Sequence, residues 1–507
     1  MKRLTMLALL FAACAWAAPA LASRHGAHAA RTPLDRANAA YNRGDYKTAF
    51  RIVRPLAEAG DPQAQYDLAV LYDWGQGVAH SPALALKWYR AAAPHKPEAA
   101  FNLGVMYDDG LGIPPDPAQA VKWYRVAAER GLSSAQFNLG LMYRKGRGVR
   151  QSYADAAKWY RAAADQGEAK AQNNLGLMYA HGEGVARDEK EAVKWYRLAA
   201  AQGLRQAQFN MGDVYAHGRG VPTDAAQAVQ WYQLAAKQGD PDAEFYLALA
   251  YDNGNGIAPD AAQAAKWYRR AADQGDPDAQ YNLALDYANG TGVAKDMAQA
   301  VKWYHSAAEQ NSTDAQFNLA LLYYYGQGVT QDRAQAAKWY RRAADLGLSK
   351  AQNNLALMYQ YGRGLARDEA QAVKWFRAAA DQGLAQAQSN LAYMYESGRG
   401  VRADKAEAAR WYRRAADQGD PEGEFKTGVA YEDGWGDEQS APQALKWYVR
   451  AADHGVARAQ FVLGYKYENG EDVEKDLAEA VNWYRAAADQ GYAPARRALK
   501  KLRQRRE

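Results

Sequence analysis

Aromatic residues recur along the chain with a period of 36 residues, against a background rich in alanine and charged side chains. One series consists of the tryptophans Trp88, Trp123, Trp159, Trp195, Trp231, Trp267, Trp303, Trp339, Trp375, Trp411, Trp447 and Trp483. Tyrosine keeps the same rhythm from Tyr72 to Tyr467. Two aromatic series in register over most of the chain predict a tandem array of about thirteen repeats.

The second half of each repeat has the spacing of an amphipathic helix. Between Ala120 and Ala128, apolar residues stand at i, i+3, i+4, i+7 and i+8, so they share one face. Glycine follows each tryptophan by eight residues in most repeats and once gives way to Asn311, which suits a left-handed helix end. An N-cap precedes each tryptophan by seven residues: Ser81, Asp116, Ser152, Asp188, Asp224, Asp260, Asp296, Asp332, Asp368, Asp404, Ser440 and Asp476.

The first half of each repeat predicts a second, shorter helix. In residues 135–143, Leu139 and Tyr143 are four positions apart and therefore share a face. Gly140 is glycine or alanine in the equivalent positions, which allows a neighbouring helix to approach closely. A Gly-x-Gly turn then leads to the second helix. The sequence therefore predicts an all-α solenoid of helix–turn–helix repeats.

Departures from the pattern mark the ends and one junction. Ile52 stands where tryptophan belongs, so residues 45–60 belong to a variant first hairpin. One residue and the usual glycine are missing within residues 93–97, and we expect an irregular junction there. Outside the aromatic series, Trp74 and Trp435 are predicted to lie exposed in turns.

The predicted domains follow from these patterns. Residues 34–491 form the solenoid, residues 23–33 a flexible linker, and residues 492–507 a basic C-terminal capping helix. Residues 1–22 read as a signal peptide, with a charged start, an apolar run and an Ala-x-Ala cleavage site before Ser23. The protein is therefore expected to be periplasmic or secreted. A lipid anchor through Cys14, the only cysteine, is the alternative.

Charge narrows the class of partner. The net charge of +6 comes from the two ends of the chain, which leaves the repeats weakly acidic. A nucleic-acid-binding face is therefore not expected. After the N-terminal segment, no run is apolar and long enough to span a bilayer, so no transmembrane segment is predicted.

The repeat carries a recognisable motif. In one unit it consists of Ala135, Leu139, Gly140, Tyr143, Gly146, Gly148, Val149, Ala156, Trp159, Tyr160, Ala163, Ala164 and Gly167. This pattern resembles the Sel-one-like repeat family, a relative of the tetratricopeptide repeat. The resemblance implies a right-handed superhelix with a concave groove, and an adaptor role such as regulating envelope sensors, supporting export or contacting host cells. Cysteine-rich members have been linked to penicillin binding, but their paired cysteines are absent here.

Catalytic motifs are missing from the sequence. The Gly-x-Gly turns lack the Gly-Lys-Ser/Thr of a phosphate-binding loop, and no serine is followed by lysine three residues later. His181 and His217 occupy the same position in consecutive repeats, too far apart to share a zinc ion. No enzyme activity, cofactor or metal is therefore predicted. A cell-wall or β-lactam hydrolase and a structural envelope spacer remain as alternatives.

An asparagine series is the first candidate binding feature. It comprises Asn102, Asn138, Asn174, Asn210, Asn282, Asn318, Asn354 and Asn390, each one residue before the leucine of the first helix. A carboxamide can both donate to and accept from a peptide backbone, so this ladder is a candidate site for an extended chain. The alternative is a hydrogen bond between repeats that fixes their stacking.

The second candidate is a variable position at the end of each first helix. Tyr324, Tyr325 and Tyr361 form an aromatic cluster there, and aromatic residues dominate binding hot spots. The same edge is basic earlier, at Arg144 and Lys145, and acidic later, at Glu396, Glu432, Asp433 and Glu468. An ordinary solvated surface is the alternative. Together the two features predict a protein- or peptide-binding adaptor of the cell envelope, whose partner is an envelope sensor or a secretion component, with glycan contact also possible.

Overall fold

The computed structural model describes residues 32–436 and 438–504. Within them the regular structure consists of 27 helices and no strands, which confirms the all-α solenoid prediction. Residues 1–22, predicted to be a signal peptide, and Cys14, the predicted alternative site of a lipid anchor, lie outside the described residues, so both stay predictions. Among the described helices, none combines the length and apolar character needed to cross a membrane.

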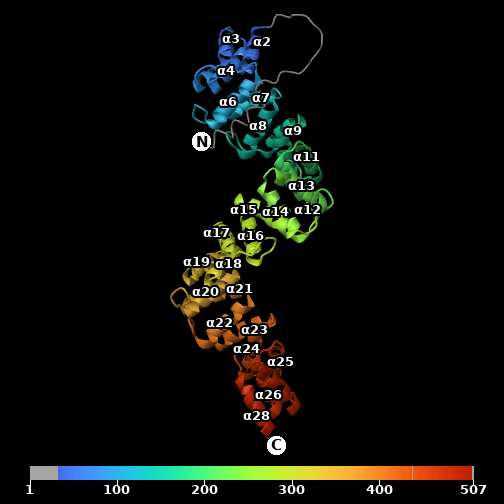
Figure 1. Cartoon of the computed structure of the whole chain (residues 1–507), viewed down its shortest axis with the longest axis vertical. Helices are drawn as coiled ribbons and strands as arrows, with labels where there is room; N and C mark the ends of the chain where they lie inside the picture. The colour runs from blue at the N-terminus through green and yellow to red at the C-terminus, as the bar shows by residue number, and fades with distance from the viewer. Residues whose placement is uncertain (1–31, 437, 505–507) are drawn as a thin grey trace. The chain divides into compact units, whose positions relative to one another are not determined.

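The chain divides into two compact units, one ending at Leu204 and one beginning at Arg205. The helices of the first unit are α2 (Pro33–Asn42), α3 (Tyr46–Glu58), α4 (Pro62–Trp74), α5 (Pro82–Ala92), α6 (Pro97–Asp109), α7 (Pro117–Glu129), α8 (Ser133–Lys145), α9 (Tyr153–Asp165), α10 (Ala169–His181) and α11 (Glu189–Ala201). Within the unit, helices that follow one another along the chain pack against each other (Figure 1).

The second unit continues the same arrangement. Its helices are α12 (Arg205–His217), α13 (Ala225–Lys237), α14 (Pro241–Asn253), α15 (Ala261–Asp273), α16 (Pro277–Asn289), α17 (Met297–Glu309), α18 (Thr313–Tyr325), α19 (Arg333–Asp345), α20 (Ser349–Tyr361), α21 (Glu369–Asp381), α22 (Ala385–Ser397), α23 (Lys405–Asp417), α24 (Pro421–Asp433), α25 (Ala441–Asp453), α26 (Ala457–Asn469), α27 (Leu477–Asp489) and α28 (Ala493–Gln504). Even-numbered helices from α4 to α26 are the first helices of repeats, and odd-numbered ones the second.

Helix boundaries follow the predicted caps. Asp188 accepts a hydrogen bond from the backbone N–H of Glu191 (2.9 Å), and every predicted N-cap except Ser440 makes such a bond. Asn311 has a φ of 68°, the left-handed conformation that glycine adopts elsewhere in this position. Local sequence therefore determines where each helix begins and ends.

The core of each repeat is the contact between its own two helices. Tyr160 of α9 is fully buried and lies flat against Gly140 of α8, where an added Cβ would come within 2.7 Å of the ring. The same contact joins Gly176 to Tyr196 and Gly464 to Tyr484. The small residue predicted at Gly140 thus makes room for an aromatic ring, which brings the two helices together.

The tryptophan series contributes less to the core than the residue that follows each tryptophan. Trp339 and Trp411 are buried, but Trp267 is only half-buried, and the guanidinium of Arg270 lies 4.8 Å from its ring centre. Tyr268, the next residue, is 1% exposed. The amphipathic pattern places both residues of each pair toward the interior, and the sequence does not reveal which one is completely covered.

Glutamine side chains join successive repeats. Gln136 of α8 donates to the carbonyl of Ala128 in the preceding repeat (3.1 Å), and it accepts from Gln166 at the end of α9 (2.7 Å). The bond to the preceding repeat recurs along the chain, for example from Gln388 to the carbonyl of Ala380 (3.2 Å). These buried amides are satisfied only when neighbouring repeats are in register, so they fix the stacking.

The predicted irregularities are present, with one exception. Residues 93–96 form a turn without a left-handed residue, and Lys96 makes no side-chain cap to α6. Trp74 is 50% exposed, although it ends α4 instead of lying in a turn. The prediction that Trp435 is exposed is wrong, because Trp435 is buried, with Lys405 above its ring, and donates to Asp433 (3.1 Å).

Candidate functional site

The first helices of the repeats carry the predicted candidate residues. Asn138 and Asn174 lie on α8 and α10 of the first unit. Asn282, Asn318 and Asn354 lie on α16, α18 and α20 of the second. All five asparagine side chains are partly exposed. Positions three and seven residues later share their helix face, so each first helix offers one face to which the asparagine and the variable terminal residue both belong.

The asparagines also contact the buried tyrosines of the preceding repeat. Asn318 donates to the hydroxyl of Tyr304 at 3.4 Å. Burial raises the pKa of Tyr340, and a side-chain hydrogen bond with Asn354 opposes that shift. This contact between repeats is the alternative role weighed for the ladder, and it is compatible with ligand binding because the amides remain partly exposed.

The three predicted tyrosines lie in the second unit, Tyr324 and Tyr325 at the end of α18 and Tyr361 at the end of α20. Tyr325 and Tyr361 are 62% and 53% exposed, unusually high for aromatic residues of this chain. The rings of Tyr324 and Tyr325 meet edge to face at 4.9 Å. Tyr324, Tyr325 and Asn354 line one hollow of about 140 Å³ between α18 and α20. The asparagine series and the variable aromatic edge therefore both contribute residues to this hollow.

Two arginines that sequence reasoning missed complete this place. Arg363, in the turn after α20, donates to the hydroxyl of Tyr324 (2.8 Å), and its guanidinium lies 4.9 Å from the ring centre of Tyr361. Arg333, the first residue of α19, lies 5.5 Å from the ring centre of Tyr324. Arg363 thus connects Tyr361 to the other two tyrosines. The one feature of the sequence that could have indicated Arg363 is that arginine recurs in the middle of Gly-x-Gly turns.

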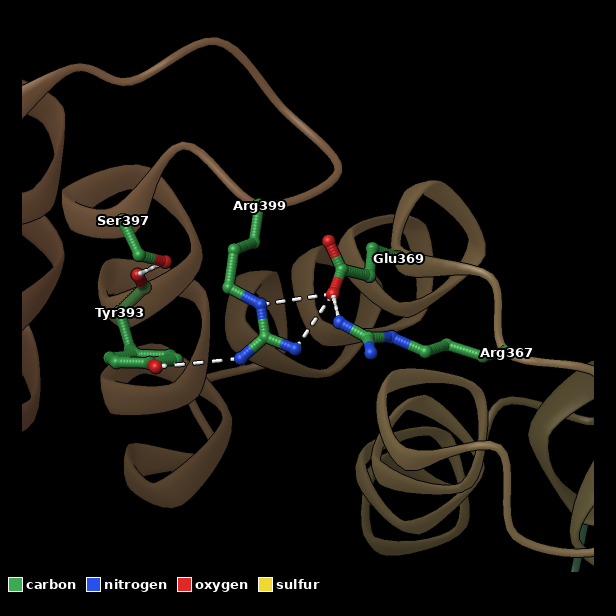
Figure 2. Close-up of polar contacts among 5 residues, drawn as sticks. All are labelled: Arg367, Glu369, Tyr393, Ser397 and Arg399. Atoms are coloured by element: carbon green, nitrogen blue, oxygen red, sulfur yellow. Dashed lines mark hydrogen bonds and ion pairs between the residues drawn. The ribbon is translucent and has the colours of Figure 1, made fainter.

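The corresponding place one repeat later is built differently (Figure 2). Arg399 donates to the Oε1 atom of Glu369 through Nε (2.9 Å) and Nη2 (2.7 Å), and Arg367 reaches the same oxygen from the other side. A third bond joins Arg399 to the hydroxyl of Tyr393 (3.4 Å). The two arginines lower the pKa of Glu369. The carboxylate therefore neutralises much of the positive charge at this turn.

The acidic residues predicted along the C-terminal edge take part in the scaffold. Glu396 accepts from the buried hydroxyl of Tyr412 and from Lys426, both at 2.6 Å. Glu432 makes the equivalent bond to Tyr448 (2.6 Å). In these repeats carboxylates replace the asparagines as partners of the buried tyrosines. Much of the edge charge is thus engaged internally and is not free for a ligand.

Groups suited to catalysis or metal binding were sought in the same residues. The described part of the chain contains no cluster of three or more histidine, cysteine, aspartate or glutamate side chains arranged to hold a metal ion. A larger, open hollow of about 580 Å³ includes His305 and Trp339, with Arg342 paired to Glu309 (3.1 Å). Burial, assisted by the charge of Asp252, raises the pKa of Asp286 to about 7. Asp286 lines neither of the two hollows.

Comparison with known proteins gives the family. The family model described as Sel1 repeat matches twelve segments, at residues 62–93, 97–132, 133–168, 169–204, 205–240, 241–276, 277–312, 313–348, 349–384, 385–420, 421–456 and 457–492. The match begins after the first hairpin, α2 and α3, which carries no tryptophan. A search of curated proteins found no match.

Solved structures include similar chains. The chain is 34% identical to c5321, a protective antigen present in uropathogenic Escherichia coli strains with an SLR fold. The alignment covers 88% of this chain and 97% of that one, with a TM-score of 0.74. A Sel1 repeat protein from Oxalobacter formigenes is 36% identical over 61% of this chain and 90% of that one, with a TM-score of 0.49. The twelve matched repeats and the similarity to c5321 show that the chain belongs to the Sel1 repeat family.

Proposed function

We propose that the protein is a non-catalytic adaptor of the cell envelope that holds a partner protein against the exposed face of α18 and α20. Sel1 repeats generally serve as protein-interaction scaffolds, which supports the class of function. One observation supports the place: Tyr324, Tyr325 and Asn354, which come from two repeats, line one hollow. Exposed tyrosines over a rigid scaffold are typical of binding hot spots.

The scaffold supports this proposal because it keeps the site preorganised. The buried ring of Tyr340 lies under the hollow, and the second helix α19 holds the two first helices apart at a fixed spacing. A partner that binds here would not have to order the site first, which lowers the entropic cost of binding.

Replacing Tyr324, Tyr325 and Tyr361 together by alanine tests the proposal. We expect partner binding to weaken by more than about 2 kcal/mol, as the loss of a hot spot does. Proteins retained from the cell's own envelope fraction by the wild-type chain and by the variant would be identified and quantified. A control with Tyr153→Ala and Tyr465→Ala removes exposed aromatic area elsewhere. Equal retention of the partner by all three chains would refute this location.

The two alternatives predict other results. A β-lactam hydrolase would react with a fluorescent penicillin, whereas the adaptor would not. A structural spacer would retain no partner at all, even in the wild-type form. Export is a separate part of the proposal, and it predicts a mature chain that begins at Ser23 outside the cytoplasm. A cytosolic protein that still begins at Met1 would overturn it, and a lipid-modified Cys14 would favour the anchored form.

A further inference from the structure

The turns after α20 and α22 hold their middle arginines in equivalent positions. In each turn the second glycine packs on the first residue of the preceding second helix. A Cβ added to Gly364 would lie 2.2 Å from the carbonyl oxygen of Arg333, and one added to Gly400 would lie 2.1 Å from that of Glu369. In these two turns the side chain of the middle arginine therefore emerges beside that helix start, where one turn has Arg333 and the other has Glu369.

The partner differs in charge between the two turns. Arg399 forms an ion pair with the carboxylate of Glu369. At the equivalent helix start the other turn has a second arginine, Arg333, and both guanidinium groups contact Tyr324: Arg333 lies over its ring and Arg363 donates to its hydroxyl. Over the described residues, no carboxylate lies within ion-pair distance of either guanidinium. Two positive charges are therefore held together without a counter-ion.

Other turn arginines of the chain are neutralised. Arg147 pairs with Asp108 (3.1 Å), and Arg219 pairs with Asp213 (2.7 Å). Of the arginines in the middle of a described Gly-x-Gly turn, Arg363 is the one that lacks an acidic partner. The unpaired charge is thus a local exception and not a general property of the repeat.

The surroundings of Arg363 suit a carboxylate attached to an apolar chain. A guanidinium offers several N–H donors in one plane, the geometry that carboxylates accept, and stacking on Tyr361 keeps that plane oriented. Leu321, Leu357 and Met358 form an apolar wall of the adjoining hollow. A side chain next to the carboxylate could be buried there, with its backbone near the amide of Asn354.

We infer that Arg333 and Arg363 bind a carboxylate side chain of an acidic peptide segment, which lies across α18 and α20. This inference rests on the proposed function and specifies the chemistry of the partner. A peptide is favoured over an acidic polysaccharide because a sugar polymer has no apolar side chain to place against Leu357 and Met358. The partner is therefore a protein segment in which acidic and apolar residues alternate closely.

A pair of synthetic peptides tests the carboxylate requirement directly. The full chain would be titrated with fluorescein-labelled (Glu-Leu-Ala)₃ and with (Gln-Leu-Ala)₃, and binding would be followed by fluorescence anisotropy. We expect the glutamate peptide to bind about tenfold or more tightly, with an affinity that falls as salt is added. Equal affinity for the two peptides, or no binding of either, would overturn the inference.

Arg333→Glu is the sharpest variant because it copies the arrangement one repeat later. The new carboxylate would pair with Arg363 as Glu369 pairs with Arg399, so the fold should be kept and the site filled. We expect the preference for the glutamate peptide to disappear while the melting curve is unchanged. Arg363→Gln should have the same effect on binding. Arg399→Gln is the matched control and should change the affinity less than twofold.

The outcomes separate this inference from the proposed function. If the triple tyrosine variant loses the cellular partner but Arg333→Glu retains it, the adaptor proposal stands and the carboxylate inference is wrong. If both variants retain the partner, both proposals are wrong. Stronger binding of an alginate oligomer than of the glutamate peptide would show that the arginines recognise a polysaccharide, which also overturns the inference.

Discussion

The turns after α20 and α22 have nearly the same backbone and opposite roles. Both pack a glycine on the preceding repeat, and both project an arginine from the middle position. One arginine is held by Glu369, and the other stands beside Arg333 with two exposed tyrosines. The comparison teaches that glycines and buried rings set the repeat scaffold, and that in these two turns the residue at the start of the preceding second helix determines whether the arginine has an acidic partner.

Removing a fully buried ring should have the largest effect on stability, because it leaves a cavity between packed helices. Phe376 of α21 lies between the two turns in the chain and is 0% exposed. Phe376→Ala should cost about 3–5 kcal/mol and broaden the unfolding transition or split it in two, since repeats couple mainly to their neighbours. Chemical denaturation followed by circular dichroism measures this. Tyr361→Ala, at an exposed ring, should change stability by less than about 0.5 kcal/mol.

Substituting two glycines by alanine distinguishes two contributions to stability: the close packing of the turn and its left-handed backbone conformation. Gly364→Ala should cost about 2 kcal/mol or more, because φ is 80° and the new Cβ would meet the backbone of Arg333. Gly383→Ala should cost about 1 kcal/mol, since its φ is 91° but no atom lies near the new Cβ. Equal losses in urea denaturation would show that packing between the turn and Arg333 contributes little.

Substituting two asparagines of the ladder distinguishes a role in stacking the repeats from a role in binding the peptide. Asn318→Ala and Asn354→Ala should each lower stability by about 1 kcal/mol, because each side chain bonds to a buried tyrosine hydroxyl. Only Asn354 lines the hollow, so only Asn354→Ala should also weaken binding of (Glu-Leu-Ala)₃. If both variants bind as the wild type does, the ladder serves stacking alone.

A buried carboxyl group in another repeat should give an effect on stability that appears only above its unfolded pKa, because it depends on pH. The carboxyl of Asp286 has a pKa of about 7, against an ordinary 3.8, because it is buried and near Asp252. The unfolded chain loses this proton near pH 4 and the folded chain near pH 7, so folded-state stability falls between those values and stays lower above them. Asp286→Asn removes that loss. Its melting temperature should exceed the wild-type value at pH 8 and approach it near pH 4, and a difference independent of pH would contradict this.

The sequence predicted the scaffold more fully than the site. Helix ends at Ser152 or Gly167 depend on local caps, so spacing alone located them. The choice between Trp267 and Tyr268 as the covered ring depends on how helices pack, and it was not readable from spacing. Trp435 was misplaced for the same reason, because the cover over its ring comes from Lys405, thirty residues earlier.

The candidate site shows the same limit more clearly. Tyr324 and Tyr325 were predicted because they are unusual occupants of a variable edge, and Asn354 because it belongs to the recurring asparagine series. Arg363 was missed because its hydrogen bond spans 39 residues, to Tyr324, and a turn residue has no periodic face from which its direction follows. The contrast between Arg333 and Glu369 depends on which helix start each turn packs against, and this packing follows from the fold and not from local sequence.

Exchanging the charge at the closed turn tests the central claim most directly. In Glu369→Arg, Arg399 should lose its carboxylate and stand beside a new arginine, as Arg363 does beside Arg333. Isothermal titration with (Glu-Leu-Ala)₃ should then give two binding sites per chain instead of one. In the combined variant Arg333→Glu with Glu369→Arg, one site should remain, now at the turn after α22. If Glu369→Arg folds normally and still binds one peptide, the residue at the helix start does not decide which turn binds.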